Sequence, residues 1–334
     1  MGNPFKMPNY CHFVESLRFS LHSPTLAHWH YAEYLKPKGF TVYKRILFIL
    51  IVLVPSLLFA GGKGEVSSSK PIVVVSILPH AFFVDQLGGS EVEVLTLVGE
   101  GQNPHSYEPS PSQMAQLSKA KVWVLSGTEF ELALKPKIQK MYPNLRIVDG
   151  TVGMTFRQLE EDDHGHDDPL NLDRHTWLGQ EQVKVLLGHT LAALIDIDPS
   201  HRSAFEERYT SLITQIDSLF DSLRAQLSSL AGQSVFVYHP SFGYLLDDVG
   251  LIQVAVETGG KEPTARDLTA LIELAKKEKP KAIFVQKQFP ASSAQAVATA
   301  VGSSVVPLDP LAYDWFENIK EIGAALLHSG GRND

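Results

Sequence analysis

The chain has 334 residues, enough for two domains of ordinary size, and its 44% hydrophobic content is typical of a globular protein with buried cores. Its formal net charge of −8 argues against nucleic acid and anionic membrane surfaces as partners. The single cysteine, Cys11, excludes an internal disulfide and a metal site built from several thiolates.

A basic pair followed by an apolar stretch indicates that residues 44–62 are a signal peptide. The segment starts with Lys44 and Arg45 and continues without another charged residue. It ends in small residues, which suit cleavage at that point. Pro55 and the shortness of the run argue against a permanent transmembrane helix, which needs about 20 apolar residues. We therefore expect a periplasmic or other extracytoplasmic protein, and we interpret residues 1–43 as a non-native or untranslated leader.

From residue 70 onward, β-rich apolar runs alternate with segments of helical pattern. The expected strands are Ile72–Ile77, Val92–Val98, Val122–Leu125, Arg146–Val148, Ser234–Tyr238, Leu251–Val256, Ala282–Val285 and Ser304–Leu308. A capping box at Ser110–Gln113, with proline at the first helical position, predicts a short helix to about Lys119. This alternation predicts an α/β fold with parallel sheets and helices on their faces.

One apolar stripe between residues 199 and 231 predicts a single long helix. Its members, such as Phe205 and Leu212, recur at steps of three and four residues. Asp198 and Pro199 stand where the N-cap and the first helical residue belong. A helix of about 30 residues spans on the order of 45 Å, long enough to cross from one lobe to another.

Residues 160–168 interrupt the alternation with the acidic, polar segment EEDDHGHDD. This composition predicts a mobile loop. Its two histidines, His164 and His166, are interpreted either as part of a solvated acidic loop or as a loose auxiliary site that gathers metal ions.

Four side chains suited to metal binding lie near the expected ends of strands or helices. Asp309 and His239 directly follow strands, His105 lies shortly after one, and His175 precedes a helix. Ligands of open α/β sheets bind outside the carboxyl ends of the strands, so we expect these four side chains to share one site. Three imidazoles and a carboxylate suit Zn²⁺ and can complete a tetrahedron, which favours holding the ion over activating a water.

A lone histidine in a loop is usually a surface residue, so this prediction depends on the shared placement of the four. Other chemistry has weaker support: Ser241 lacks the G-x-S-x-G context of a nucleophile, and Pro104 replaces a glycine of the dinucleotide fingerprint. Asp173, Tyr107 and Glu108 are candidates for orienting the imidazole rings. The histidines assigned to ordinary helix or surface positions are His80, His189, His201 and His328.

Together these features resemble the metal-binding solute-binding proteins of zinc and manganese ABC importers, the cluster A-I family. The segments that carry the resemblance are GQNPHSYEPSPSQ (101–113), LDRHTWLG (172–179), VYHPSFGYLLDDVGL (237–251), GGKEPTARDLTALI (259–272) and VVPLDPLAYDW (305–315). The resemblance covers about residues 70–328 in consistent order. Most members have Asp-Pro-His where this chain has Asp173-Arg174-His175, a departure that keeps the ligand.

The resemblance implies two Rossmann-like α/β lobes with parallel sheets, residues 70–198 and 232–334, joined by one long helix, residues 199–231. The positions that match the family's metal ligands are His105, His175, His239 and Asp309. It further implies a membrane permease as partner, powered by a separate ATPase subunit, with only small lobe movement on binding. We expect a monomer without enzymatic activity.

Three imidazoles favour zinc over manganese. Manganese is the harder ion and favours oxygen ligands, and manganese-type members of the family usually have a carboxylate at the position of His239. The expected function is therefore high-affinity extracytoplasmic zinc binding and delivery of the ion to an ABC importer. The alternatives are a manganese or mixed zinc, manganese and iron protein of the same type, a zinc-dependent hydrolase, and a surface adhesin.

Overall fold

The computed structural model describes residues 70–159, 172–257, 264–289 and 292–329. Residues 69–334 form one compact unit, to which all that follows refers. The predicted leader (1–43), the predicted signal peptide (44–62) and His164 and His166 lie outside the described residues. Within the described ranges, no helix has both the length and the apolar composition needed to cross a membrane.

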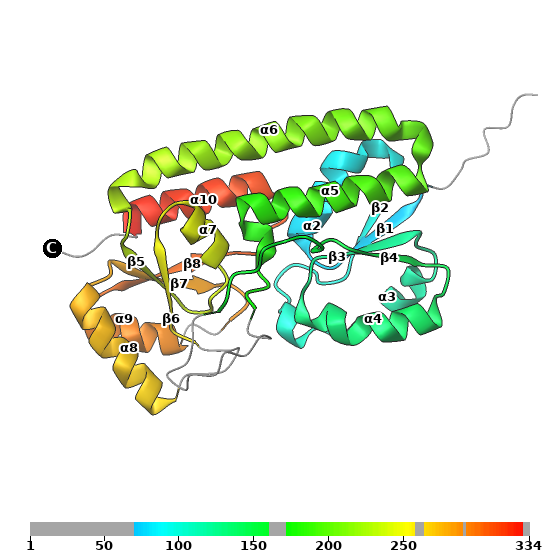
Figure 1. The fold of residues 1–334 in the computed structure, drawn as a ribbon. Coiled ribbons are helices and arrows are strands. Elements are labelled where there is room, and N and C mark those ends of the chain that lie inside the picture. The colour runs from blue at the N-terminus through cyan, green and yellow to red at the C-terminus, as the bar shows by residue number, and fades with distance from the viewer. Residues whose placement is uncertain (1–69, 160–171, 258–263, 290–291, 330–334) are drawn as a thin grey trace, which may run out of the picture. The chain divides into compact units, whose positions relative to one another are not determined.

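The first lobe is built on a parallel four-stranded sheet of order β2-β1-β3-β4 (Figure 1). Its strands are β1 (Ile72–Val75), β2 (Glu93–Thr96), β3 (Val122–Leu125) and β4 (Arg146–Asp149). Val73 of β1 lies opposite Val94 of β2 and Val122 of β3, which sets the register. The central strands are buried on both faces, as expected for a parallel sheet covered by helices.

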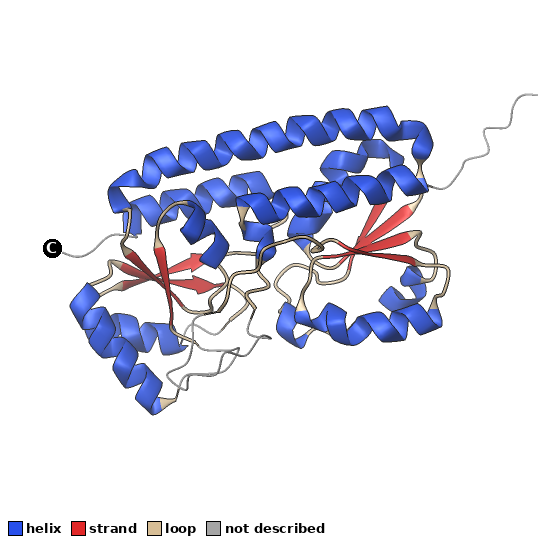
Figure 2. Cartoon of the chain, viewed as in Figure 1, coloured by secondary structure: helices blue, strands red, loops and turns tan. Residues whose placement is uncertain are grey.

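Helices cover both faces of this first sheet (Figure 2). They are α2 (Leu78–Gly88), α3 (Pro111–Leu117), α4 (Glu129–Met141) and α5 (Gln180–Ile197). The capping box predicted for α3 is present: the Ser110 side chain accepts from the Gln113 amide, while the Gln113 side chain accepts from the Ser110 amide. The local sequence therefore fixes where the chain turns after the loop that carries His105.

The second lobe repeats this topology with a sheet of order β6-β5-β7-β8. Its strands are β5 (Ser234–Val237), β6 (Ile252–Ala255), β7 (Ala282–Gln286) and β8 (Ser304–Leu308). Its helices are α7 (Gly243–Asp248), α8 (Ala265–Glu278), α9 (Ser292–Val301) and α10 (Trp315–Ser329). In both lobes the strand that comes first in the chain is central, so the loops after the strands of each sheet emerge on one edge.

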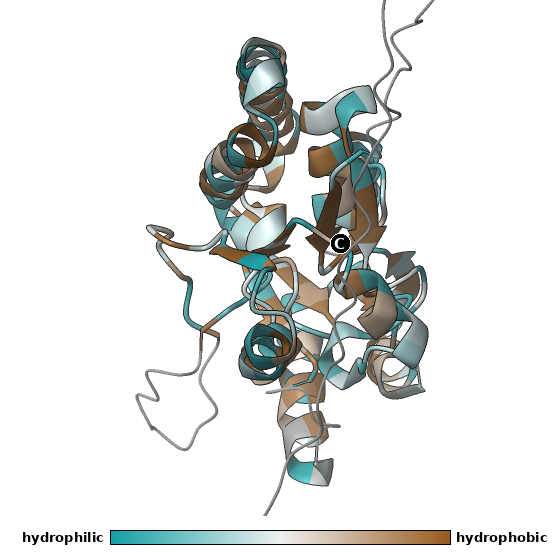
Figure 3. Ribbon diagram, turned by 90° about the vertical axis from the view of Figure 1, so that its right-hand side faces the viewer, coloured by the Kyte–Doolittle hydropathy of each residue, from teal (hydrophilic) through white to brown (hydrophobic). Residues whose placement is uncertain are grey.

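The long helix α6 (Arg202–Leu227) joins the two lobes, with a 3-10 turn at each end. It packs against α2 and α5 of the first lobe and α10 of the second. Its apolar stripe is buried, including Phe205, Leu212 and Phe220. In Figure 3 the strands are coloured mostly as hydrophobic, while the helices around them show both hydropathy colours. The predicted α/β fold of two lobes joined by one long helix is confirmed.

Candidate metal site

Three histidines from separate parts of the chain meet between the two sheets. His105 lies in a 3-10 turn, His175 precedes α5, and His239 follows β5. The Nε2 atom of His239 lies 3.1 Å from that of His105 and 3.1 Å from that of His175. The ligand atoms of all three lie within 4.8 Å of one another. Three nitrogens held about 2.0–2.1 Å from one tetrahedral Zn²⁺ would be roughly 3.3 Å apart, so the spacing suits a single ion.

The turn that carries His105 has a clear local cause. The Asn103 side chain accepts a hydrogen bond from the His105 amide at 2.9 Å, which caps the turn. Pro104 occupies its first position and is buried. The two residues before His105 thus fix the backbone that presents its imidazole, whose side chain remains 30% exposed.

Each of the three imidazoles has a carboxylate at its other ring nitrogen. The Nδ1 atom of His175 lies 2.8 Å from Asp173 and that of His239 lies 3.0 Å from Glu257. The Nδ1 atom of His105 lies 3.5 Å from Glu129. Pairs of this kind fix both the orientation and the tautomer of metal-binding histidines.

The tautomer has a direct consequence for what the site can hold. An ionised carboxylate only accepts hydrogen bonds, so the proton of each neutral ring lies on Nδ1. The three Nε2 lone pairs then face one another without a proton to share. Such an arrangement is repulsive unless a cation lies between the rings, and borderline-soft divalent cations are the ones that prefer imidazole.

Burial and the neighbouring charges act differently on the individual rings. Burial lowers the pKa of His239 to about 4, despite the opposing effect of Glu257, so this ring is neutral at physiological pH. Burial also acts to lower the pKa of His105, but the Glu129 carboxylate outweighs it and the net shift is upward. Burial favours protonated Glu129, yet the nearby His105 and His175 bring its pKa down to about 2, so Glu129 is ionised.

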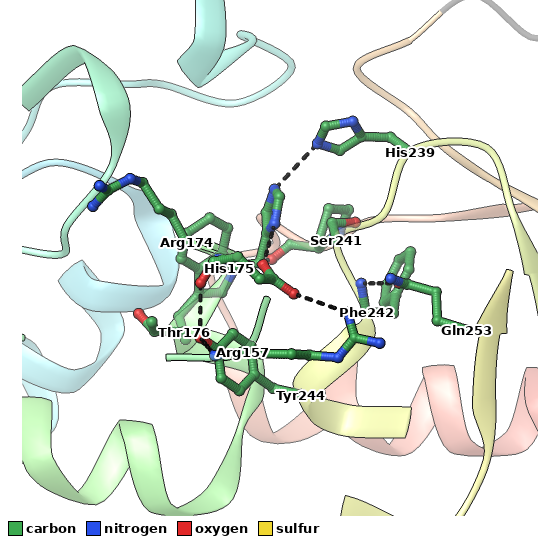
Figure 4. Close-up of polar contacts among 12 residues, drawn as sticks. Arg157, Arg174, His175, Thr176, His239, Ser241, Phe242, Tyr244 and Gln253 are labelled. Atoms are coloured by element: carbon green, nitrogen blue, oxygen red, sulfur yellow. Dashed lines mark hydrogen bonds and ion pairs between the residues drawn. The ribbon is translucent and has the colours of Figure 1, made fainter. Parts of the chain in front are cut away.

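The histidines line a small cavity of about 20 Å³. This volume admits one or two water-sized species. Phe289 stacks on His239 with ring centroids 4.6 Å apart, and Trp177 and His175 form a T-shaped pair with centroids 5.3 Å apart. Figure 4 shows His175 and His239 pointing toward each other in this region.

Asp309, the fourth predicted ligand, is not part of the histidine group. It follows β8, as expected, and its Oδ1 atom accepts hydrogen bonds from Gln288 at 2.7 Å and from the Leu311 amide at 3.0 Å. Its Oδ2 atom lies 3.7 Å from the Lys287 ammonium. Its neighbours Gln288 and Leu311 line the histidine cavity.

Sequence reasoning found one of the three carboxylates and missed two. Asp173 was named as an orienting residue, whereas Glu129 and Glu257 were not. Glu257 lies directly after the predicted strand Leu251–Val256, the same signal that pointed to His239, so it could have been found. By contrast, Glu108 is exposed, and the Tyr107 ring packs on that of Phe130 with centroids 5.0 Å apart. Neither residue is the carboxylate partner of a histidine in the group.

Comparison with known proteins shows the family. The family model described as zinc-uptake complex component A, periplasmic (ZnuA) matches residues 73–326. A putative metal-binding protein of Chlamydia trachomatis serovar D is 26% identical over 85% of this chain and 99% of its own length. The zinc-binding lipoprotein AdcA of Streptococcus pneumoniae strain R6 is 27% identical over 80% of this chain, which spans 55% of AdcA.

A solved structure points the same way. The crystal structure of a ZnuA deletion mutant with zinc bound is 31% identical to this chain, with a TM-score of 0.74. The alignment covers 79% of this chain and 100% of that one. Because the family model also spans most of the sequence, this chain belongs to the family of periplasmic A components of zinc-uptake complexes.

Proposed function

We propose that this protein binds one zinc ion between its lobes through His105, His175 and His239 and delivers it to an ABC importer. The observation that carries the proposal is the convergence of three Nε2 atoms whose rings are each held by a carboxylate at Nδ1. Membership in the family supports the uptake role. The partners are a membrane permease and a separate ATPase subunit, and the protein works as a monomer in the periplasm or an equivalent extracytoplasmic space.

Asp309 is the proposed fourth ligand. Its position directly after β8 and its cavity-lining neighbours support this role. Binding the ion would bring a carboxylate oxygen to the metal in place of a present neighbour, Gln288 at Oδ1 or Lys287 at Oδ2. A neutral imidazole set with one added carboxylate would leave the bound ion partly balanced in charge and closed to water.

The protein is proposed to hold and release the ion without catalysing a reaction. A hydrolase would need a nucleophile and a base beside the metal. Ser241 is buried and its hydroxyl accepts a hydrogen bond from Gln286. Nδ1 of His239 faces Glu257 and its Nε2 faces those of the other two histidines, so His239 is not arranged as a base for Ser241.

Manganese is the second candidate cargo, and the donor set favours zinc over it. The atoms that converge are imidazole nitrogens, which suit zinc, whereas manganese favours oxygen. The carboxylates of Asp173, Glu257 and Glu129 face the outer nitrogens of the rings. We therefore expect manganese to bind this site more weakly than zinc.

Competition with a chelating zinc indicator tests the proposal on metal-free protein. We expect one zinc ion per chain. His105→Ala and His239→Ala should each lower zinc affinity more than about 100-fold, because losing a ligand costs more affinity than losing the hydrogen-bond partner of a ligand. His189→Ala is the matched control, since this ring bonds the Val152 carbonyl at 2.8 Å and lies outside the histidine group. Unchanged zinc affinity in both ligand variants would contradict the assignment.

A further inference from the structure

Asp173, whose carboxylate orients His175, is held by residues from both lobes. Tyr244, on α7 of the second lobe, donates its hydroxyl hydrogen bond to the Asp173 carbonyl at 2.7 Å. The same hydroxyl accepts from the amide of Arg157 at 2.9 Å. Figure 4 shows Tyr244 and Arg157 beside the loop that leads to His175. A hydrogen bond from the second lobe therefore holds the backbone of the first lobe at Asp173.

The side chain of Arg157 completes this arrangement. Its Nη1 atom faces the Asp173 Oδ2 atom at 3.8 Å, and its Nε atom donates to Asp247 of α7 at 2.9 Å. The Asp173 side chain is fully buried, and its Oδ1 atom accepts from both the ring and the amide of His175. Within the described residues Oδ2 accepts no hydrogen bond, so the facing guanidinium balances a buried negative charge that would otherwise be costly.

Gly243 leaves room for the Arg157 guanidinium beside α7. A Cβ atom at this position, the first residue of α7, would come within 2.7 Å of the Arg157 Cζ atom. Because that contact is with the end of a flexible side chain, an added methyl group would push the guanidinium away while leaving the backbone in place. The close approach of Arg157 to α7 thus depends on the absence of a side chain at Gly243.

We infer that Tyr244 and Arg157 are positioning residues for zinc binding that act on His175 through Asp173. Tyr244 fixes the backbone of Asp173, and Arg157 supports its carboxylate, so the orientation of the His175 ring depends on contact between the lobes. The other two rings are held separately, by Glu129 and Glu257. The inference rests on the proposed zinc-binding role of the histidine group.

The expected effect is moderate. Removing an outer partner that touches a ligand typically lowers metal affinity 10- to 100-fold. Tyr244 acts one step further out, so we expect Tyr244→Phe to weaken zinc binding about 5- to 10-fold. The matched control is Tyr142→Phe, which removes a hydroxyl that donates to the Met114 carbonyl at the same 2.7 Å in the first lobe. We expect the control to leave zinc affinity unchanged while losing similar stability in the metal-free state.

A comparison of two backgrounds separates positioning of His175 from general packing. Zinc affinity is measured by indicator competition with and without Tyr244→Phe in His105→Ala and in His175→Ala proteins. We expect the 5- to 10-fold loss to persist in the first background and to vanish in the second, because the ring that Tyr244 positions is gone. An equal loss in both backgrounds, or no loss in the parent protein, would overturn the inference.

Gly243→Ala gives an independent variant that removes no polar group. We expect it to weaken zinc binding in the same direction as Tyr244→Phe, with little change in thermal unfolding of the metal-free protein. Normal zinc affinity in this variant would show that Arg157 is dispensable. Failure of the proposed function is distinguishable, because the parent protein would then not bind zinc, or His105→Ala would bind it as well as the parent does.

Discussion

His80 lies buried on α2 between two hydroxyl groups of the first lobe. Its Nδ1 atom is 3.0 Å from the Ser126 hydroxyl and its Nε2 atom 3.1 Å from that of Thr190. Burial lowers its pKa to about 3. This ring stays neutral in the folded protein at any physiological pH and is part of the core, away from the histidine group.

His80 should make the stability of the metal-free protein depend on pH. An unfolded chain protonates this ring near pH 6.5, whereas the folded chain resists protonation down to about pH 3. Its contribution is therefore present above pH 6.5 and is lost as the pH falls toward 3. Between pH 7 and pH 5 the loss is about 2 kcal/mol in the free energy of unfolding.

Urea unfolding of metal-free parent and His80→Gln protein at pH 7 and pH 5 measures this contribution. Glutamine keeps hydrogen-bonding groups but does not titrate. We expect the variant to be less stable at pH 7 but to lose about 2 kcal/mol less than the parent between the two pH values. Equal losses in the two proteins would show that folding does not lower the pKa of His80.

Strand order predicts where some residues of the candidate site lie. His239 follows a strand, and the carboxyl ends of parallel strands meet on one edge, so its position at that edge follows from topology. The partner of His105, Glu129, does not follow a strand. It begins α4, whose start is marked in the sequence by the capping-box pattern of Thr128 and Glu131. The position of Asp309 relative to the rings depends on side-chain contacts such as that with Gln288, which no local pattern encodes.

At the level of single elements, α3 was predicted from its capping box and α6 from its apolar stripe, whereas α2 and α4 were not predicted. α6 shows a single stripe and was predicted nearly to its ends. α2 is buried on almost every side, so it has no polar face and no 3.6-residue period to detect. α4 contains Pro136, which usually ends a helix in a sequence pattern. Both misses therefore have a physical cause.

The contact between α6 and α10 should carry much of the stability of the long helix. Phe220 is fully buried and lies 6.2 Å from the Trp315 ring. We expect Phe220→Ala to lower the free energy of unfolding by about 3–5 kcal/mol, because it leaves a cavity in the core. Ser218→Ala, at an exposed position on the same helix, should change it by less than about 0.5 kcal/mol.

Urea unfolding of the metal-free proteins checks this contrast, and zinc affinity is measured alongside it. Phe220 lies outside the cavity that the histidines line, so the folded variant should keep the zinc affinity of the parent. If Phe220→Ala cost no more stability than Ser218→Ala, α6 would not be anchored through this contact.

On the scale of the whole molecule, the site exists because the two lobes are held together. Trp177 donates its indole hydrogen bond to the Pro310 carbonyl at 2.8 Å, and Trp315 donates to the Trp177 carbonyl at 2.7 Å. These bonds join the segment after His175 to the second lobe. Together with α6, they keep the imidazoles from different lobes at distances that suit one ion.

X-ray absorption at the zinc edge tests most directly whether imidazoles from both lobes bind the same ion. For zinc-loaded parent protein we predict three imidazole nitrogens about 2.0–2.1 Å from the metal. His105→Ala, in the first lobe, and His239→Ala, in the second, should each reduce the count to two. A parent spectrum with fewer than three imidazoles, or one that neither substitution changes, would contradict the account.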